Sequence, residues 1–255
     1  MTLTGSPISV EYLFPEPGKW FDLQNGLRAL PGPGYILAAA SEPWVTINSG
    51  VFGGGIGPKR FFLNRQVDKG YTSDCPQDEM AVFLASEFEI YRPIVSTDWA
   101  ALMTAARVND ASWVSLSHKE HYVTVIITAG VNNACSAGIT PHCVPASNTI
   151  QPGTINIMAF LSHSLSPGTL VNAVQTVTEA KTQTLRQLNI TCPVTGTFAS
   201  GTNTDALVIA AADSISYDEY AGPGTLTGYM LALGVRKALF QTLKRYLALE
   251  RQVAP

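Results

Sequence analysis

The chain has 255 residues, of which 46% are hydrophobic and only 14% are charged. A chain of this length can bury most of its apolar surface without disulfides or structural metals, so one domain spanning residues 1–255 is predicted. The net charge of −3, with no lysine–arginine cluster denser than two adjacent residues, excludes nucleic acid as the main partner, because phosphate backbones need a broad basic face.

The first third of the chain is typical of short strands separated by proline and glycine turns. Acidic residues at Asp78 and Glu79 favour the start of a first helix. The predicted elements are strands Ser9–Leu13, Tyr35–Ala40 and Val45–Ser49, turns Pro15–Gly18 and Pro31–Gly34, a glycine cluster at Gly53–Gly57, and helix Gln77–Glu89.

The middle of the chain predicts longer strands that neighbour one another, at Leu102–Val108, Trp113–Ser117 and Tyr122–Val131. The third is β-branched on both faces, which is typical of a central strand. Residues Asn132–Pro152 follow as a polar loop of a length that is usually functional or mobile.

The last third predicts strand Gly153–Leu161, helix Pro167–Leu188, strand Asp205–Ala212 and a long helix from Thr225 to Arg251. Strands grouped early and long helices placed late favour an α+β fold over strict βαβ alternation. We therefore expect a layered core of mixed β-sheet that packs against long α-helices.

The helix Pro167–Leu188 carries an unusual lysine. At 100° per residue, Lys181 falls within the apolar stripe, whereas Glu179 falls on the opposite face. A lysine in such a stripe either extends its ammonium to water or is paired. Glu179 is ordinary surface on this wheel, unless both faces of the helix are covered.

Two loops carry candidate binding groups. Asn132 and Asn133 follow the predicted central strand, where their amides either hold a substrate carbonyl or form a turn. The run Gly196–Asp205 places glycines and hydroxyls before a buried strand, and its final carboxylate is suited to orient a water, to accept a proton or to cap a turn.

Three other patterns give weaker indications of function. The cluster Gly53–Gly57 suits an oxyanion cradle or a tight turn. The run His118–His121 lacks metalloprotease spacing, and on a strand its two histidines would point to opposite faces, so a loop or edge pair is expected. Cys135 is expected to be a buried small thiol rather than a nucleophile.

The four cysteines lack C-x-x-C spacing, which favours reduced thiols. The N-terminal residues show no basic segment followed by an apolar run, and no apolar stretch reaches the roughly 20 residues that cross a bilayer. We expect a cytoplasmic protein that acts on a small molecule, with no membrane contact, no cofactor and no metal site. The oligomeric state is left open.

Nine segments, in order, resemble the adenosylcobinamide amidohydrolase family, and together they span roughly residues 45 to 240. They are Gly53–Gly57, Phe62–Val67, Leu102–Ala106, Thr128–Ala134, Gly153–Ile157, Leu165–Ser166 with Asn172–Val174, Thr178–Thr182, Ser200–Ala206 and Tyr220–Thr225. Asn203 departs from the family pattern, where a glycine is expected between the two threonines.

The resemblance implies hydrolysis of the amide that joins a corrin propionyl side chain to aminopropanol, with the corrinoid as substrate. Amide hydrolysis needs an activated nucleophile and an oxyanion clamp. We assign catalysis to Glu179, Asp205 and Lys181, with Glu179 or Asp205 activating water. Substrate contacts are assigned to Asn132, Asn133, Asn156, Gly54, Gly55, Thr202, Asn203 and Thr204.

A nucleophilic Thr202 or Thr204 is a variant of this mechanism. Two other readings stay open. In one, the scaffold is repurposed for a non-corrinoid amide, lactone or enolisable carbonyl in a biosynthetic pathway. In the other, the protein binds corrinoid without turnover.

Overall fold

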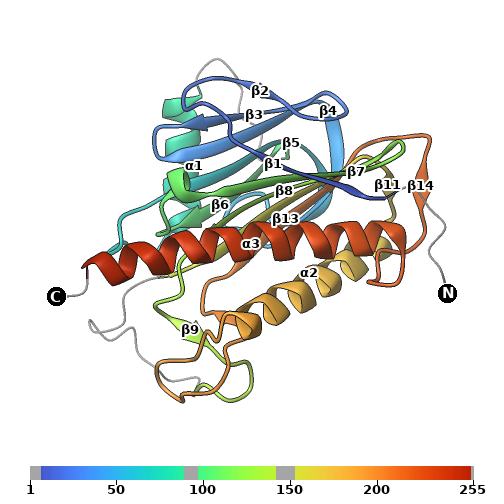
Figure 1. Cartoon of the computed structure of the whole chain (residues 1–255). Helices are drawn as coiled ribbons and strands as arrows, with labels where there is room; N and C mark the ends of the chain where they lie inside the picture. The colour runs from blue at the N-terminus through green and yellow to red at the C-terminus, as the bar shows by residue number, and fades with distance from the viewer. Residues whose placement is uncertain (1–6, 89–96, 142–152, 254–255) are drawn as a thin grey trace.

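The computed structural model describes residues 7–88, 97–141 and 153–253, and it is organised around one large curled sheet (Figure 1). His142 and Cys143 of the predicted polar loop lie outside these residues. The strands of the large sheet are β1 (Ser9–Leu13), β2 (Phe21–Asp22), β3 (Leu27–Gly32), β4 (Tyr35–Asn48), β5 (Gly55–Gln66), β6 (Trp99–Thr104), β7 (Ser112–His118), β8 (His121–Ala129), β10 (Ile155–Leu161) and β13 (Ala206–Ala211).

Two short strand pairs and the helices complete the described fold. The pairs are β9 (Ala134–Cys135) with β12 (Gly201–Thr202) and β11 (Ser164–Leu165) with β14 (Tyr217–Asp218). The helices are α1 (Pro76–Glu87), α2 (Pro167–Gln187), α3 (Leu226–Val253) and the 3-10 helix η2 (Val108–Asp110). None of the helices in the described ranges is both long and apolar enough to span a membrane.

The large sheet is mixed. Its strand order is β1-β7-β8-β10-β13-β4-β3-β2, and β5 pairs with both β4 and β6. The β10–β13 and β5–β6 pairs are parallel, and the other pairs of the sheet are antiparallel. This architecture confirms the expected α+β class, with a mixed sheet packed against long helices.

Strand β4 causes the curl. It is 14 residues long, and its pairing with β5 is irregular between Ala39 and Trp44. A bulge of this kind bends a strand and increases its twist. The two predicted strands Tyr35–Ala40 and Val45–Ser49 are therefore the two halves of one bent strand, the first beside β3 and the second beside β13.

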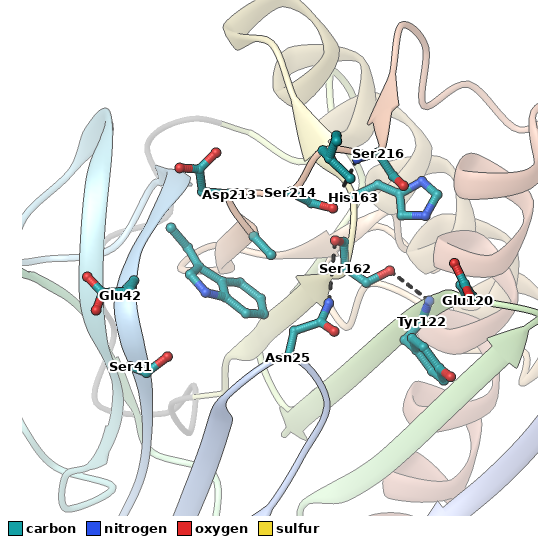
Figure 2. A pocket seen from close by; sticks show the side chains of 13 residues that line it. Asn25, Ser41, Glu42, Glu120, Tyr122, Ser162, His163, Asp213, Ser214 and Ser216 are labelled. Atoms are coloured by element: carbon teal, nitrogen blue, oxygen red, sulfur yellow. Dashed lines mark hydrogen bonds between the residues drawn. The ribbon is translucent and has the colours of Figure 1, made fainter.

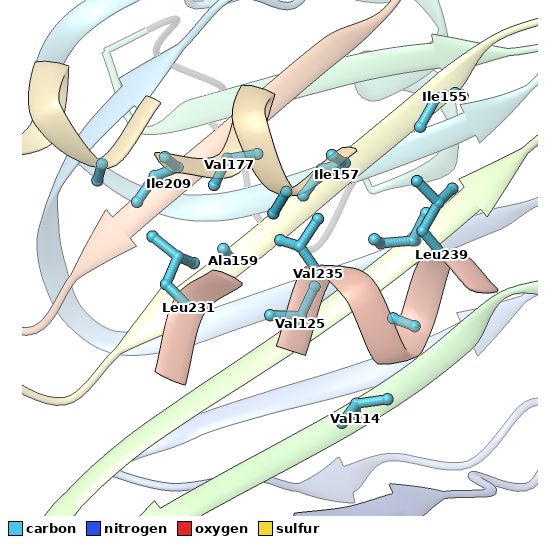
Figure 3. Packing of buried hydrophobic residues seen from close by; sticks show 14 of the residues in the cluster. Val114, Val125, Ile155, Ile157, Ala159, Val177, Ile209, Leu231, Val235 and Leu239 are labelled. Atoms are coloured by element: carbon cyan, nitrogen blue, oxygen red, sulfur yellow. The ribbon is translucent and has the colours of Figure 1, made fainter. Parts of the chain in front are cut away.

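The curl separates three apolar cores. The largest lies between α2, α3 and one face of the sheet, where Val177 and Val235 meet Ile157 and Ile209 (Figure 3). A second core fills the inside of the curl and includes Phe62, Leu102, Trp113, Met158 and Phe160. The third lies under α1 and includes Met80, Leu84, Leu63 and Trp99.

The structure corrects two sequence expectations. The predicted strand Leu102–Val108 is β6, Trp99–Thr104, and it pairs with β5 rather than with β7. The 12-residue strand β5 was not predicted, because Gly55, Gly57 and Pro58 at its start mask the apolar run that follows. The neighbouring β7–β8 pair, the interior position of β8 and both late helices are confirmed.

Two glycines let α3 approach its neighbours closely. A Cβ at Gly228 would overlap the carbonyl oxygens of Ala221 and Gly222, which are backbone atoms. A Cβ at Gly234 would lie 2.8 Å from side-chain methyls of Leu116 and Val125. Side-chain methyls can shift at lower cost than backbone carbonyls.

This difference predicts unequal effects of two identical substitutions. Both Gly228→Ala and Gly234→Ala gain about 1 kcal/mol of helix propensity. Overlap with backbone should make Gly228→Ala destabilising by about 1–3 kcal/mol, whereas Gly234→Ala should stay close to the wild-type free energy of unfolding. Urea denaturation followed by circular dichroism measures both, and equal midpoints for the two variants would contradict the packing described.

Candidate functional site

Asp205, directly before β13, holds a carboxylate that accepts four hydrogen bonds. Lys181 Nζ donates to its Oδ2 at 2.5 Å, and the Thr202 backbone N–H donates to the same oxygen at 3.1 Å. The Thr202 hydroxyl at 2.5 Å and the Ile155 N–H at 3.1 Å donate to Oδ1. A carboxylate offers about four acceptor positions, so all of them are taken.

The lysine reaches this carboxylate because of the helix pattern. The side chains of Lys181 and Asp205 are each only 14% exposed, so the ion pair is largely buried. The sequence expectation that a lysine in the apolar stripe of α2 would extend to water or be paired is resolved in favour of pairing. Its partner comes from a loop that the sequence did not connect to the helix.

Pairing of the two-residue strands β9 and β12 brings Thr202 to Asp205. Thr202 lies opposite Ala134 and Gly201 opposite Cys135 in the β9–β12 pair. A Cβ at Gly201 would overlap Asp205 Oδ2 and lie 2.8 Å from Lys181 Nζ. Glycine at this position therefore leaves the space that the ion pair occupies.

The two asparagines after β8 have different surroundings. Asn132 Oδ1 accepts a hydrogen bond from the Tyr246 hydroxyl of α3 at 2.5 Å. Burial, together with Glu250, raises the pKa of Tyr246 to about 12, so the phenol stays protonated and can donate. Asn133 Oδ1 is buried and has no hydrogen-bond partner among the described residues. It lies beside Gly153, where a Cβ would come within 2.5 Å of this oxygen.

A cavity of about 340 Å³ opens beside Asp205. Thr154 and Thr204 line it from the same end of the sheet, with their hydroxyl oxygens 2.7 Å apart, and Thr204 also donates to Gly153 O. The residues that line it also include Gly50 from the loop after β4, Tyr71 from the segment before α1, and Met103 from β6.

A smaller hollow of about 140 Å³ includes Lys181, Asp205 and Val177 in its lining. Asp205 therefore lies between the two spaces, with the lysine on one side and the threonine hydroxyls on the other.

Several predicted site residues lie elsewhere. Glu179 is exposed on α2, two residues from Lys181 and on the other face of the helix, so the structure does not bring it to Asp205. Gly54 and Gly55 are exposed at the start of β5, and Asn203 is exposed in its loop; none of the three is among the cavity-lining residues. Gly50, four residues before Gly54, lines the cavity instead.

Asn156 is fully buried on the opposite face of β10 from Ile155 and Ile157. Its Nδ2 donates to Asn64 Oδ1 and to Met103 O, both at 2.8 Å, and Asn64 donates to Thr128 Oγ1 at 2.9 Å. These bonds join β10, β5, β6 and β8 inside the curl. The geometry fits a structural role better than substrate contact.

Cys135 is half-buried beside this site. Burial, and next the charge of Asp205, raise the pKa of its thiol. A protonated thiol is a weak nucleophile, which fits the sequence expectation for this residue.

The structure also corrects the expectation for the His118–His121 run. His118 ends β7, His121 begins β8, and the two face each other across a two-residue turn in which Lys119 has φ of 55°. Directly opposed residues of an antiparallel pair share a face of the sheet. The expectation of opposite faces is wrong, because the chain reverses between the two histidines.

Sequence reasoning missed Tyr246 and Tyr71, since each reaches the site from a distant element without a local signal. Thr154 belongs to the matched segment Gly153–Ile157, but the sequence analysis gave it no role. In the structure it precedes β10 and lines the same cavity as Asp205.

A family model and two named relatives carry the same description. A family model described as adenosylcobinamide amidohydrolase matches residues 26–251. An adenosylcobinamide amidohydrolase from Halobacterium salinarum is 31% identical over 123 residues, which cover 48% of this chain and 50% of that protein. The corresponding enzyme from Methanosarcina mazei is 29% identical over 157 residues, covering 62% and 64%.

An uncharacterised protein from Methanocaldococcus jannaschii is 29% identical over 168 residues, covering 59% of this chain and 64% of that protein. The chain thus spans between half and about two thirds of the length of these curated relatives.

The buried ion pair predicts coupled effects on stability. Lys181→Met should cost about 3 kcal/mol of unfolding free energy, because it leaves a buried carboxylate without its counter-charge. In the Lys181→Met background, Asp205→Asn should lower the free energy of unfolding by less than it does in the wild type. The difference, the coupling energy, should be about 1–3 kcal/mol.

A urea double-mutant cycle measures this coupling, and exposed Lys237→Met is the matched control, expected within about 0.5 kcal/mol of wild type. Strictly additive costs would show that the pair contributes no interaction of its own.

Proposed function

The chain belongs to the adenosylcobinamide amidohydrolase family, and from that premise we propose that it hydrolyses adenosylcobinamide to adenosylcobyric acid and aminopropanol. The observation that carries the proposal is the cavity beside the Asp205–Lys181 pair, where a buried carboxylate, an ammonium and threonine hydroxyls converge. Four of the nine sequence segments that resemble the family line the cavity, and a fifth, Thr178–Thr182, supplies Lys181.

The size of the cavity limits what it admits. At about 340 Å³ it lies at the lower end of the range for small-molecule pockets, roughly 300–1,000 Å³. A corrin macrocycle does not fit inside such a space, but the amide-linked aminopropanol arm does. In the proposal the arm enters and the ring stays at the mouth of the cavity.

Asp205 is the proposed base. A water that replaces the Thr202 hydroxyl at Asp205 Oδ1 gives up a proton to the carboxylate as its oxygen attacks the amide carbon. The C–N bond then breaks, and the departing amine takes the proton from Asp205. The products are a corrin carboxylate and free aminopropanol.

Lys181 has an electrostatic role in this proposal. The ammonium, 2.5 Å from Asp205 Oδ2, orients the carboxylate and balances negative charge at the site. Asn133 is not among the residues that line the cavity, and its buried amide oxygen has no hydrogen-bond partner among the described residues; a substrate role for it would need the turn after β8 to open. Asn132 supports this turn through Tyr246.

The direct test is incubation of the purified chain with adenosylcobinamide, followed by mass spectrometry of the corrinoid and of released aminopropanol. We expect adenosylcobyric acid and aminopropanol in equal amounts. Corrinoid that binds but stays intact would support a binding protein instead, and corrinoid that does not bind would support a repurposed scaffold. Either of these results would reject the proposed reaction.

The site predicts which substitutions stop turnover. Asp205→Asn and Lys181→Met should each lower kcat/KM by about 10²–10⁴, because they remove the base and the charge beside it. Exposed Glu179→Gln is the matched control and should keep activity close to wild type. Steady-state kinetics measures kcat/KM of the three variants, and circular dichroism checks that each variant is folded.

Full activity in Asp205→Asn would remove this site from the reaction. The variant Thr202→Ala distinguishes activated water from attack by Thr202, whose hydroxyl donates to Asp205. Activated water does not need that hydroxyl, whereas direct attack by threonine does.

A further inference from the structure

Two histidines and an aspartate meet at the far end of the sheet from Asp205. His121 begins β8, His163 lies between β10 and β11, and Asp218 ends β14. The Oδ2 atom of Asp218 lies 3.5 Å from His121 Nε2 and 3.2 Å from His163 Nδ1. All three donor atoms lie within 4.8 Å of one another.

Backbone pairing fixes these positions. Leu165 lies opposite Asp218 in the parallel β11–β14 pair, which ties the segment after His163 to the aspartate. Ser162 N–H donates to Tyr122 O at 3.0 Å, and Tyr122 N–H donates to Ser162 Oγ at 2.9 Å, which ties His163 to the start of β8. The three side chains are thus held by hydrogen bonds that do not involve the side chains themselves.

We propose that His121, His163 and Asp218 bind a divalent transition-metal ion of the zinc type. A tetrahedral ion with ligands at about 2.0–2.1 Å separates its donor atoms by about 3.3 Å. The two measured separations from Asp218, 3.5 and 3.2 Å, bracket that value. Two imidazoles and one carboxylate also form a ligand set that zinc and iron(II) favour.

The packing of the two imidazoles agrees with this use. His163 Nδ1 is buried and faces Asp218 Oδ2 at 3.2 Å without a well-aligned hydrogen bond among the described residues, so a cation between the two atoms would satisfy both. The two imidazole rings lie 3.7 Å apart between centroids.

Thr227, in the first turn of α3, supports the carboxylate. Its hydroxyl donates to Asp218 Oδ2 at 2.6 Å and lies 3.1 Å from His121 Nε2. Thr227 thus contacts two of the three donor atoms and holds them together beside the start of α3.

A cavity of about 520 Å³ gives a cation access to the group, and His163 is part of its wall (Figure 2). The acidic residues Glu42, Glu120 and Asp213 also line it. No lysine or arginine is among the described residues of this lining. The lining therefore attracts cations, and three protein ligands leave a coordination position for water or a small molecule.

This site is separate from the proposed hydrolase site. Asp205 precedes β13 and Asp213 follows it, so the two sites lie at opposite ends of strands about 20 Å long. The sequence expectation of no metal site rested on the spacing of the histidines. That spacing shows no ligand pattern, because the three ligands come from three separate segments.

Metal titration of the full chain, after removal of bound metal with a chelator, tests the proposal. We expect one Co²⁺ per chain, with visible d–d absorption bands of a protein-bound ion, and its displacement by one Zn²⁺. The variants His163→Ala and Asp218→Asn should weaken binding by at least about 100-fold, since they remove ligands and not outer contacts.

His118→Ala is the matched control, because it removes a histidine from the same hairpin that is not among the three ligands. It should bind Co²⁺ as the wild type does. Asp218→Asn keeps the shape of its side chain, so it remains informative even where His163→Ala fails to fold. Substoichiometric binding by the wild type, or wild-type binding in Asp218→Asn, would overturn the proposal.

Discussion

Burial of β10 on both faces is the constraint on which the rest of the structure depends. All seven residues of this strand are buried, with α2 and α3 over one face and the other half of the curled sheet over the second. A ligand can therefore reach the centre of the sheet only where its strands begin or end. The Asp205 pair and the His163 group lie at these two places.

The same constraint explains the polar network inside the curl. Asn64, Asn156 and Thr128 are buried, and leaving such groups without hydrogen bonds costs about 1–3 kcal/mol each. Their mutual bonds satisfy most of this need and tie β5 to β8 and β10 at one register. The asparagine amides thereby specify how the two halves of the sheet face each other.

The sequence predicted what depends on local pattern. The stripe of α2 marked Lys181 as a residue in need of a partner, and the loop ending at Asp205 was marked as functional. Their contact was beyond such reasoning, because it depends on the β9–β12 pairing, which joins two-residue strands with no periodic signal. Glu179 was included on the condition that both faces of α2 are covered, and the structure leaves its face exposed. The histidine–aspartate group was missed for the same reason: its three segments meet only through tertiary pairing.

The two ends of the β10–β13 pair also differ in kind, because parallel strands present backbone N–H groups at their amino ends and carbonyl groups at their carboxyl ends. At the amino end, the Ile155 N–H donates to the Asp205 carboxylate, together with Thr202. At the carboxyl end, the carbonyl oxygens of Ala212 and Ser214 both accept from the Ser164 hydroxyl. The N–H groups of Ile155 and Thr202 suit a carboxylate, and the acidic side chains near the carboxyl end suit a cation. One strand pair thus supports opposite chemistry at its two ends, which is the arrangement that the proposed hydrolysis and the proposed metal site each require.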